Sequence, residues 1–211
     1  GTLDAGSVGG STLPVLIIHD RWSKCTWSHP VPSKGVAHPY PGKILLAVLD
    51  KLGYKKVILK SDQEPAIKAL VQSVKNGRSG NLIPEHSPKG ESRSNGEIER
   101  CVQSVTGLAR TLREHLEQAA SIVLEPKMAI MAWLVNHCGS LHNLFHRGED
   151  GMTPFMRLKG RQWKVDLPPF GECVEFMRRT KHKFERRWSP GVFLGVRENT
   201  TEKVVGDASG T

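Results

Sequence analysis

Two acidic residues of this chain, Asp62 and Glu99, have types and positions suited to chemistry on a phosphate. Asp62 follows the apolar run 57–59, and Glu99 lies in the string 94–100 (SNGEIER), which opens a long amphipathic segment. An acid at the end of a strand and another on a helix can converge on one divalent cation, as in sites that transfer phosphoryl groups with two metal ions. The pair therefore points to polynucleotide chemistry.

The sequence around these acids predicts the elements that position them. Pro41 and Pro65 suit the first turns of two helices, and Gly53 and Gly77 suit their ends. The run 55–60 (KKVILK) is typical of a buried strand, so we expect the first acid between a strand and a helix. We predict strands over 13–19, 24–31, 55–60 and 81–85, a turn at 20–23, helices over 41–52 and 65–75, and a polar loop over 86–94.

The second half of the chain changes from helical to strand patterns. From Gly96 onward, apolar residues recur at steps of three and four, which predicts a long helix with one buried stripe and places Glu99 off it or at its margin. Further helices are expected over 126–144 and 153–160, and short alternating runs after 166–169 predict a small β module. The stripe consists of Ile98, Cys101, Val102, Val105, Leu108, Ala109, Leu112 and Leu116, and the alternating runs are 173–177 and 192–196.

The charge of the chain favours a polyanionic partner such as nucleic acid. Its 211 residues include 30 Lys and Arg against 21 Asp and Glu, a net charge of +9. The four cysteines are widely spaced without a CxxC, which is typical of reduced intracellular thiols. No apolar run reaches the ~18 residues of a membrane span, so we expect no membrane association. The Gly/Ser-rich start, residues 1–11, does not begin with Met, and we expect the true N-terminus upstream.

The order of segments over 13–116 resembles the RNase H-like core of retroviral and copia-type retrotransposon integrases. In that family an acid on the first strand, an Asp after the fourth strand and a Glu on the following helix hold two divalent metal ions. Ser61 and Asp62 resemble the segment of the second acid, and 87–100, in which SP is followed by NGEIER, resembles the segment of the third. The resemblance implies that Asp62 and Glu99 are catalytic and bind Mg²⁺ or Mn²⁺.

Glu97 is the competitor for the third position. On a helix, residues two apart point about 200° from one another, so only one of Glu97 and Glu99 can face an acid at a strand end. The family string assigns that role to Glu99, and the helical geometry agrees that only one can take it.

The resemblance continues beyond the core. Thr153-Pro154, Phe170-Gly171 and the string 191–195 (GVFLG) follow the order of motifs in copia-type integrases. The family's N-terminal His/Cys zinc module is not in this sequence, which again favours an N-terminal truncation. We predict an α/β chain with an RNase H-like mixed sheet flanked by helices, the first strand missing, followed by a helical extension and a small β module. The predicted domains are 1–122 (partial catalytic core), 123–165 (helical extension) and 166–211 (small basic β module).

The first acid of the triad has two weak candidates in the chain. Asp20 follows the strand that would pair antiparallel with the catalytic strand, so the first acid should lie near Leu13, about 24 Å from Asp20 at about 3.4 Å a residue. Asp20 is therefore predicted to form a turn. Asp4 is on the correct side of the sheet but lacks the apolar neighbours of a strand. We expect the first acid upstream of Gly1, and no DNA nicking by residues 1–211.

The implied function is that of a polynucleotidyl transferase of a transposable element. It would process DNA 3′ ends as an endonuclease and join them to target DNA, one metal ion activating water or a 3′-hydroxyl and the second stabilising the leaving oxygen. The expected partners are DNA and further copies of the chain, and the intact protein would act in the nucleus. Residues expected to contact nucleic acid, with a solvated surface as the alternative, are Lys89, Arg93, Arg100, Arg186, Arg187 and Trp188.

Other interpretations stay open at this point. The chain could be a non-catalytic descendant that binds DNA or a protein, or a related transposase or nuclease of cellular origin, against which the motifs after the core argue. A zinc site is not expected, because nine histidines produce metal-like spacings easily. The residues that raise the possibility are His137, Cys138, His142 and His146.

Overall fold

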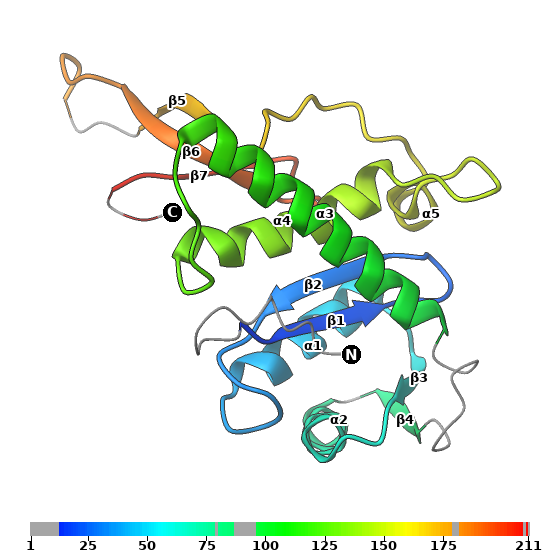
Figure 1. Ribbon diagram of the computed structural model, residues 1–211. Coiled ribbons are helices and arrows are strands. Elements are labelled where there is room, and N and C mark those ends of the chain that lie inside the picture. Colours follow the sequence, from blue (N-terminus) through cyan, green and yellow to red (C-terminus); the bar gives the residue numbers. More distant parts are fainter. Residues whose placement is uncertain (1–12, 79, 87–95, 179–181, 209, 211) are drawn as a thin grey trace. The chain divides into compact units, whose positions relative to one another are not determined.

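The computed structural model describes residues 13–78, 80–86, 96–178, 182–208 and 210 (Figure 1). The chain divides into two compact units, one of residues 1–19 and 27–106 and the other of 20–26 and 107–211. This division does not coincide with the three domains predicted from the sequence, which stay a prediction.

The first unit combines two small sheets with helices. One sheet is a hairpin, and the other pairs two parallel strands that are joined through a helix. Its elements are β1 (Val15–His19), β2 (Thr26–Pro30), α1 (Tyr40–Leu52), β3 (Lys56–Ser61), α2 (Pro65–Gly77), β4 (Asn81–His86) and the beginning of α3 (Gly96–Ala120).

The predicted start and stop residues of these helices are confirmed. Pro41 and Pro65 lie in the first turns of α1 and α2, and Gly53 ends α1 with φ +69°, a conformation that glycine adopts without steric cost. Both helices turn apolar residues toward a common core, on which side chains of β1 and β3 also pack. This core consists of Leu45, Leu49, Leu70, Val71, Val74 and Leu82, with Leu16, Ile18, Leu46, Val57, Leu59 and Ile67 around it.

The strand predicted over 55–60 is present, but the prediction that it is buried is wrong. Exposed and half-buried residues alternate along β3, and Ile58 keeps 60% of its surface exposed. Its register partner Ile83 on β4 is 38% exposed. Helix α2 packs on β3 and β4, and Val57 and Leu59 face the helical core. The apolar run is thus compatible with a sheet covered on one face.

The two sheets of the first unit are separate in the described part of the chain. β1 pairs with β2 and β3 pairs with β4, and no described strand bridges the pairs. The predicted α/β class, with helices beside the strands, is confirmed, although the strands of this unit form two small sheets. What the structure has is one antiparallel hairpin and one parallel pair, both resting on the same helical core.

The second unit contains helices and a three-stranded antiparallel sheet in the order β5-β6-β7. The small β module predicted after 166–169 is confirmed, but its third strand was not predicted, because a four-residue run is too short for a periodic pattern. The elements are the remainder of α3, α4 (Ala129–Phe145), α5 (Pro154–Lys159), β5 (Cys173–Met177), β6 (Trp188–Val196) and β7 (Lys203–Gly206).

Two glycines of this unit explain motifs that the sequence displayed. Gly171 has φ +84°, and a Cβ there would lie 2.5 Å from Leu116 Cδ1. At Gly191 a Cβ would lie 2.5 Å from Val205 and 3.0 Å from the carbonyl oxygen of Gly206. Glycine is favoured at position 171 by its positive φ and at position 191 by close packing against Val205 and the backbone of Gly206.

A buried polar side chain, Asn143 of α4, ties distant segments of the second unit together. Its Oδ1 accepts a hydrogen bond from the backbone N–H of Thr26 at 2.7 Å, and its Nδ2 donates to Glu198 Oε1 at 3.2 Å. All three residues are buried. The described helices include none that is long and apolar enough to cross a membrane.

Candidate functional site

Asp62 leaves the carboxyl end of β3 and is half-buried. Its Oδ1 accepts a hydrogen bond from the backbone N–H of Glu64 at 3.2 Å, which shapes the turn into α2. The Ser61 hydroxyl donates to the Asp62 carbonyl oxygen, also at 3.2 Å. No described residue donates a hydrogen bond to Oδ2.

The parallel register of β3 and β4 directs two connections to one edge of their sheet. Ser61 is opposite His86, so both strands end together. Asp62 follows the first strand, and the segment that leads to α3 follows the second. Because carboxyl ends of parallel strands share an edge, the acid and the connection to Glu99 start from the same place.

Helix α3 carries Glu99 on an exposed surface in its first turn. Cys101 and Val105, one helical turn apart, are buried, and Cys101 Sγ lies 3.3 Å from Nδ1 of His19, the last residue of β1. This contact fixes the beginning of the helix against the hairpin. Since residues two apart diverge by about 200°, Glu99 points away from that contact and toward solvent.

Asp62 and Glu99 thus belong to the same compact unit, both with access to solvent. Two carboxylates supply hard oxygen donors of the kind that Mg²⁺ and Mn²⁺ prefer. Within the described ranges, no group of three or more His, Cys, Asp and Glu side chains is placed to hold a metal ion. The described residues therefore offer at most a pair of ligands.

The other aspartates considered as the first acid have different outcomes. The predicted turn at Asp20 is confirmed, because its Oδ2 accepts hydrogen bonds from the Ser23 backbone N–H at 2.8 Å and the Ser23 hydroxyl at 2.6 Å. Asp4 lies outside the described residues.

Of the basic residues predicted near the acids, the structure places one. Arg100 follows Glu99 on α3 and is exposed. Lys89 and Arg93 lie outside the described residues.

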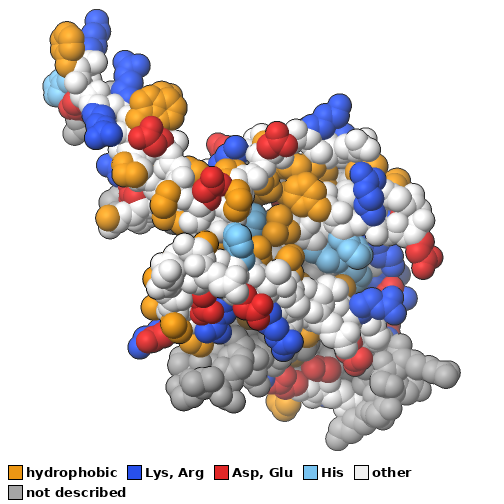
Figure 2. All heavy atoms as spheres, turned by 45° about the horizontal axis from the view of Figure 1, so that its top comes forward, with side chains coloured by type: hydrophobic (Ala, Val, Ile, Leu, Met, Phe, Trp, Pro, Cys, Tyr) orange, Lys and Arg blue, Asp and Glu red, His pale blue; other side chains and the backbone are white. Residues whose placement is uncertain are grey.

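The remaining predicted nucleic-acid contacts lie at the end of the β5–β6 hairpin. Arg186 and Arg187 are exposed, and Trp188, 52% exposed, pairs with Met177 at the last rung of the ladder. Figure 2 shows Lys, Arg and apolar side chains gathered on the extension at its upper left. The structure adds Phe184, whose side chain is fully exposed among these cations. An aromatic residue inside the basic run was the signal available in the sequence.

The histidines weighed as zinc ligands have other surroundings. The rings of His142 and His146 stack with centroids 4.7 Å apart, although His146 lies just beyond the end of α4 and not on its face. His137, 3% exposed, packs on Phe170 and Phe193, and burial lowers its pKa to about 4. Burial also raises the pKa of the Cys138 thiol to about 12.

Comparison with solved structures identifies the kind of fold. No family model and no curated protein matches the chain. A solved chain from the simian T-cell lymphotropic virus intasome in complex with the PP2A regulatory subunit B56 gamma is similar, with a TM-score of 0.54 and 12% identity over 92% of this chain.

The chain has an integrase-like fold. It spans 66% of that viral chain's length. The catalytic core domain of BIV integrase also matches, with a TM-score of 0.47 and 14% identity over 68% of this chain and 84% of that domain.

Proposed function

We propose that this chain is part of an integrase-type polynucleotidyl transferase that cuts DNA 3′ ends and joins them to a target DNA. The observation that carries the proposal is the placement of Asp62 and Glu99. The first leaves a strand and the second lies in the first turn of a helix fixed by the Cys101–His19 contact, in one unit of an integrase-like fold. Two acids in such positions suit chemistry at phosphorus.

Asp62 and Glu99 would hold Mg²⁺ or Mn²⁺, and the bound metal would supply Lewis-acid activation of the attacking and leaving oxygens. A third carboxylate would come from a residue that the structure does not describe. Asp4 is one such residue. Arg100, beside Glu99, would bind a backbone phosphate and hold the DNA near the acids. The backbone N–H of Glu64, which binds Asp62 Oδ1, would orient the other carboxylate oxygen toward the ligand.

DNA is the proposed substrate. We also propose that the chain has an RNase H-like architecture and comes from a retrotransposon integrase. The chain's net charge of +9 supports a polyanionic partner. We further propose that the intact protein assembles with copies of itself, as the viral relative is described within an intasome, and that it acts in the nucleus where its DNA target would lie.

A direct test asks whether the two acids share one metal ion. Wild type, Asp62→Asn and Glu99→Gln are titrated with Mn²⁺ by calorimetry, and each substitution should weaken binding about tenfold or more, because ligand charge sets affinity. Glu97→Gln is the matched control, since Glu97 is two residues away on the same helix. Binding that is equal in all four proteins contradicts the proposal.

Proximity can be tested with Fe²⁺ in place of Mn²⁺. With hydrogen peroxide and ascorbate added, the bound Fe²⁺ reduces peroxide to hydroxyl radicals, which should cleave the polypeptide near both residue 62 and residue 99. Asp62→Asn should abolish both cleavages together. Cleavage at one position alone would mean that the two acids do not share a metal.

A non-catalytic role in binding nucleic acid is the second candidate. The exposed Phe184 and Trp188 among arginines at the β5–β6 hairpin favour it. DNA binding that survives in Asp62→Asn, in a protein with no specific Mn²⁺ site, would support this alternative over the first.

A further inference from the structure

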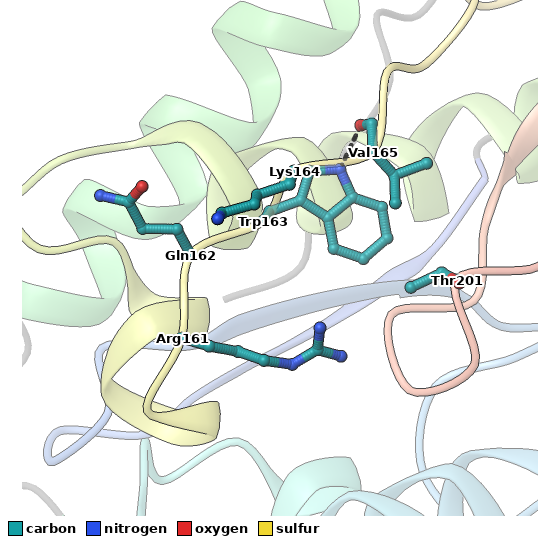
Figure 3. A pocket seen from close by; sticks show the side chains of 6 residues that line it. All are labelled: Arg161, Gln162, Trp163, Lys164, Val165 and Thr201. Carbon is teal, nitrogen blue, oxygen red and sulfur yellow. Dashed lines mark hydrogen bonds between the residues drawn. The ribbon is translucent and has the colours of Figure 1, made fainter.

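An open hollow of about 460 Å³ lies in the second unit, beside the segment that follows α5 (Figure 3). Five consecutive residues of this segment line it, together with one residue from the turn between β6 and β7. These residues are Arg161, Gln162, Trp163, Lys164, Val165 and Thr201.

One wall of the hollow is a fixed indole. Trp163 Nε1 donates a hydrogen bond to the carbonyl oxygen of Val165 at 2.6 Å, the dashed line in Figure 3. The ring meets Phe155 edge to face, with centroids 5.4 Å apart, and Phe155 is fully buried in the core of the unit. The indole therefore offers a rigid apolar surface without an ordering cost on binding.

The opposite wall comes from a turn whose polar groups already have partners. The backbone N–H of Thr201 donates to the carbonyl oxygen of Arg197 at 2.8 Å, and its hydroxyl donates to the carbonyl oxygen of Thr200 at 2.5 Å. Thr201 has φ +62°. These hydrogen bonds fix the shape of the turn, which therefore forms a rigid wall of the hollow.

Two cations project from the lining segment without an acid to neutralise them. Arg161 and Lys164 are exposed, no acidic residue lines the hollow, and neither cation forms an ion pair with a described residue. The Arg161 guanidinium lies 5.9 Å from the centroid of Phe155. In Figure 3 its side chain extends below the indole toward Thr201. Among the described residues, those that line the hollow thus include two cations and no acid.

We propose that this hollow binds one phosphodiester unit of a polynucleotide. Arg161 and Lys164 hold the phosphate, and the indole of Trp163 packs against the adjoining sugar or base. A planar guanidinium beside an aromatic wall suits a nucleotide, which joins an anion to a flat ring. The choice of polynucleotide rests on the proposed function, but none of these residues belongs to the acid pair.

The test measures binding of a fluorescein-labelled single-stranded oligonucleotide by anisotropy over a series of salt concentrations. Arg161→Gln/Lys164→Gln should bind about tenfold more weakly, and its salt slope should fall by about one, because both cations bind the same phosphate. Arg161→Lys, which keeps the charge but loses the planar guanidinium, should bind more weakly than wild type and more tightly than Arg161→Gln. Lys159→Gln is the control, because Lys159 is exposed nearby but does not line the hollow.

Equal loss in Lys159→Gln and in each single variant, Arg161→Gln and Lys164→Gln, would show a general charge effect and overturn the proposal. So would an unchanged slope in the double variant. A second arm adds inorganic phosphate at fixed ionic strength. Competition by free phosphate without any effect of the double variant on the oligonucleotide would assign the hollow to a small anion and also overturn it.

The outcome is separable from that of the acid pair. Loss of oligonucleotide affinity in the double variant, with unchanged Mn²⁺ binding, supports the hollow alone. Failure of Mn²⁺ to bind Asp62 and Glu99 would remove the proposed catalysis and leave the phosphodiester site intact.

Discussion

The two units of this chain use their polar side chains in opposite ways. In the second unit, Asn143 is buried and both ends of its amide have partners, and Asp20 gives one oxygen to two hydrogen bonds. In the first unit, Asp62 accepts one hydrogen bond of 3.2 Å at its Oδ1, and Glu99 is exposed. The difference shows that the role of an acid after a strand depends on whether its carboxylate oxygens already accept hydrogen bonds from the fold. Side chains committed to the fold should cost stability when removed, and side chains left open should cost function.

The largest effect is expected at Asn143. Asn143→Ala leaves the Thr26 N–H and the Glu198 carboxylate buried without this partner, so the free energy of unfolding should fall by about 3 kcal/mol. Urea unfolding followed by circular dichroism measures it. The control is Asn199→Ala, at an exposed position. If Asn143→Ala lowers the free energy of unfolding no more than the control does, the proposed difference between the two units is wrong.

The second effect is a pH dependence at His137. Its folded pKa of about 4 is below the unfolded value, so the unfolded chain binds the proton first as pH falls, and stability is lost between pH ~6.5 and ~4. At pH 5 the loss should be about 2 kcal/mol relative to pH 7. The difference between wild type and His137→Leu isolates it from other titrating groups. Parallel curves for the two proteins would contradict the assignment.

A smaller loss is expected at Asp20. Asp20→Ala removes both hydrogen bonds to the buried Ser23, and the free energy of unfolding should fall by about 1.5 kcal/mol. Mn²⁺ binding should not change. A weakened Mn²⁺ affinity in this variant would return Asp20 to the list of candidate ligands.

The smallest change in stability is expected at the acid pair. Asp62→Asn and Glu99→Gln should each alter the free energy of unfolding by no more than about 0.5 kcal/mol, since neither residue is buried. Thermal unfolding without metal measures this, and added Mn²⁺ should stabilise the wild type alone. A large loss without metal would make the two acids structural, like those of the second unit.

Local signals made much of this fold predictable. Prolines and glycines marked the ends of α1 and α2, the spacing of apolar residues predicted the buried side of α3, and the Asp20 turn followed from strand geometry. Each of these depends on residues within a few positions of one another. The placement of Asp62 after β3 and of Glu99 in the first turn of α3 was predictable for the same reason.

What the sequence could not supply depends on contacts between distant segments. Thr201 completes a hollow with residues 161–165, and nothing in either segment indicates the other. The exposure of Ile58 follows from which face α2 covers, not from the apolar run itself. The Cys101–His19 contact likewise joins residues 82 positions apart.

The one-sided cover of β3 bears on how the protein behaves in concentrated solution. β3 pairs with β4 on one side, no described strand lies on its other side, and Ile58 is exposed on its face. A strand edge that has no partner can template the strand of another molecule. Lys56 and Lys60 flank the isoleucine on the exposed face, and Lys60 Nζ lies 3.7 Å from Glu85 Oε1 on β4. Charges beside an exposed apolar residue hinder association between sheet edges, so Lys56→Ala is expected to lower solubility before it alters the fold.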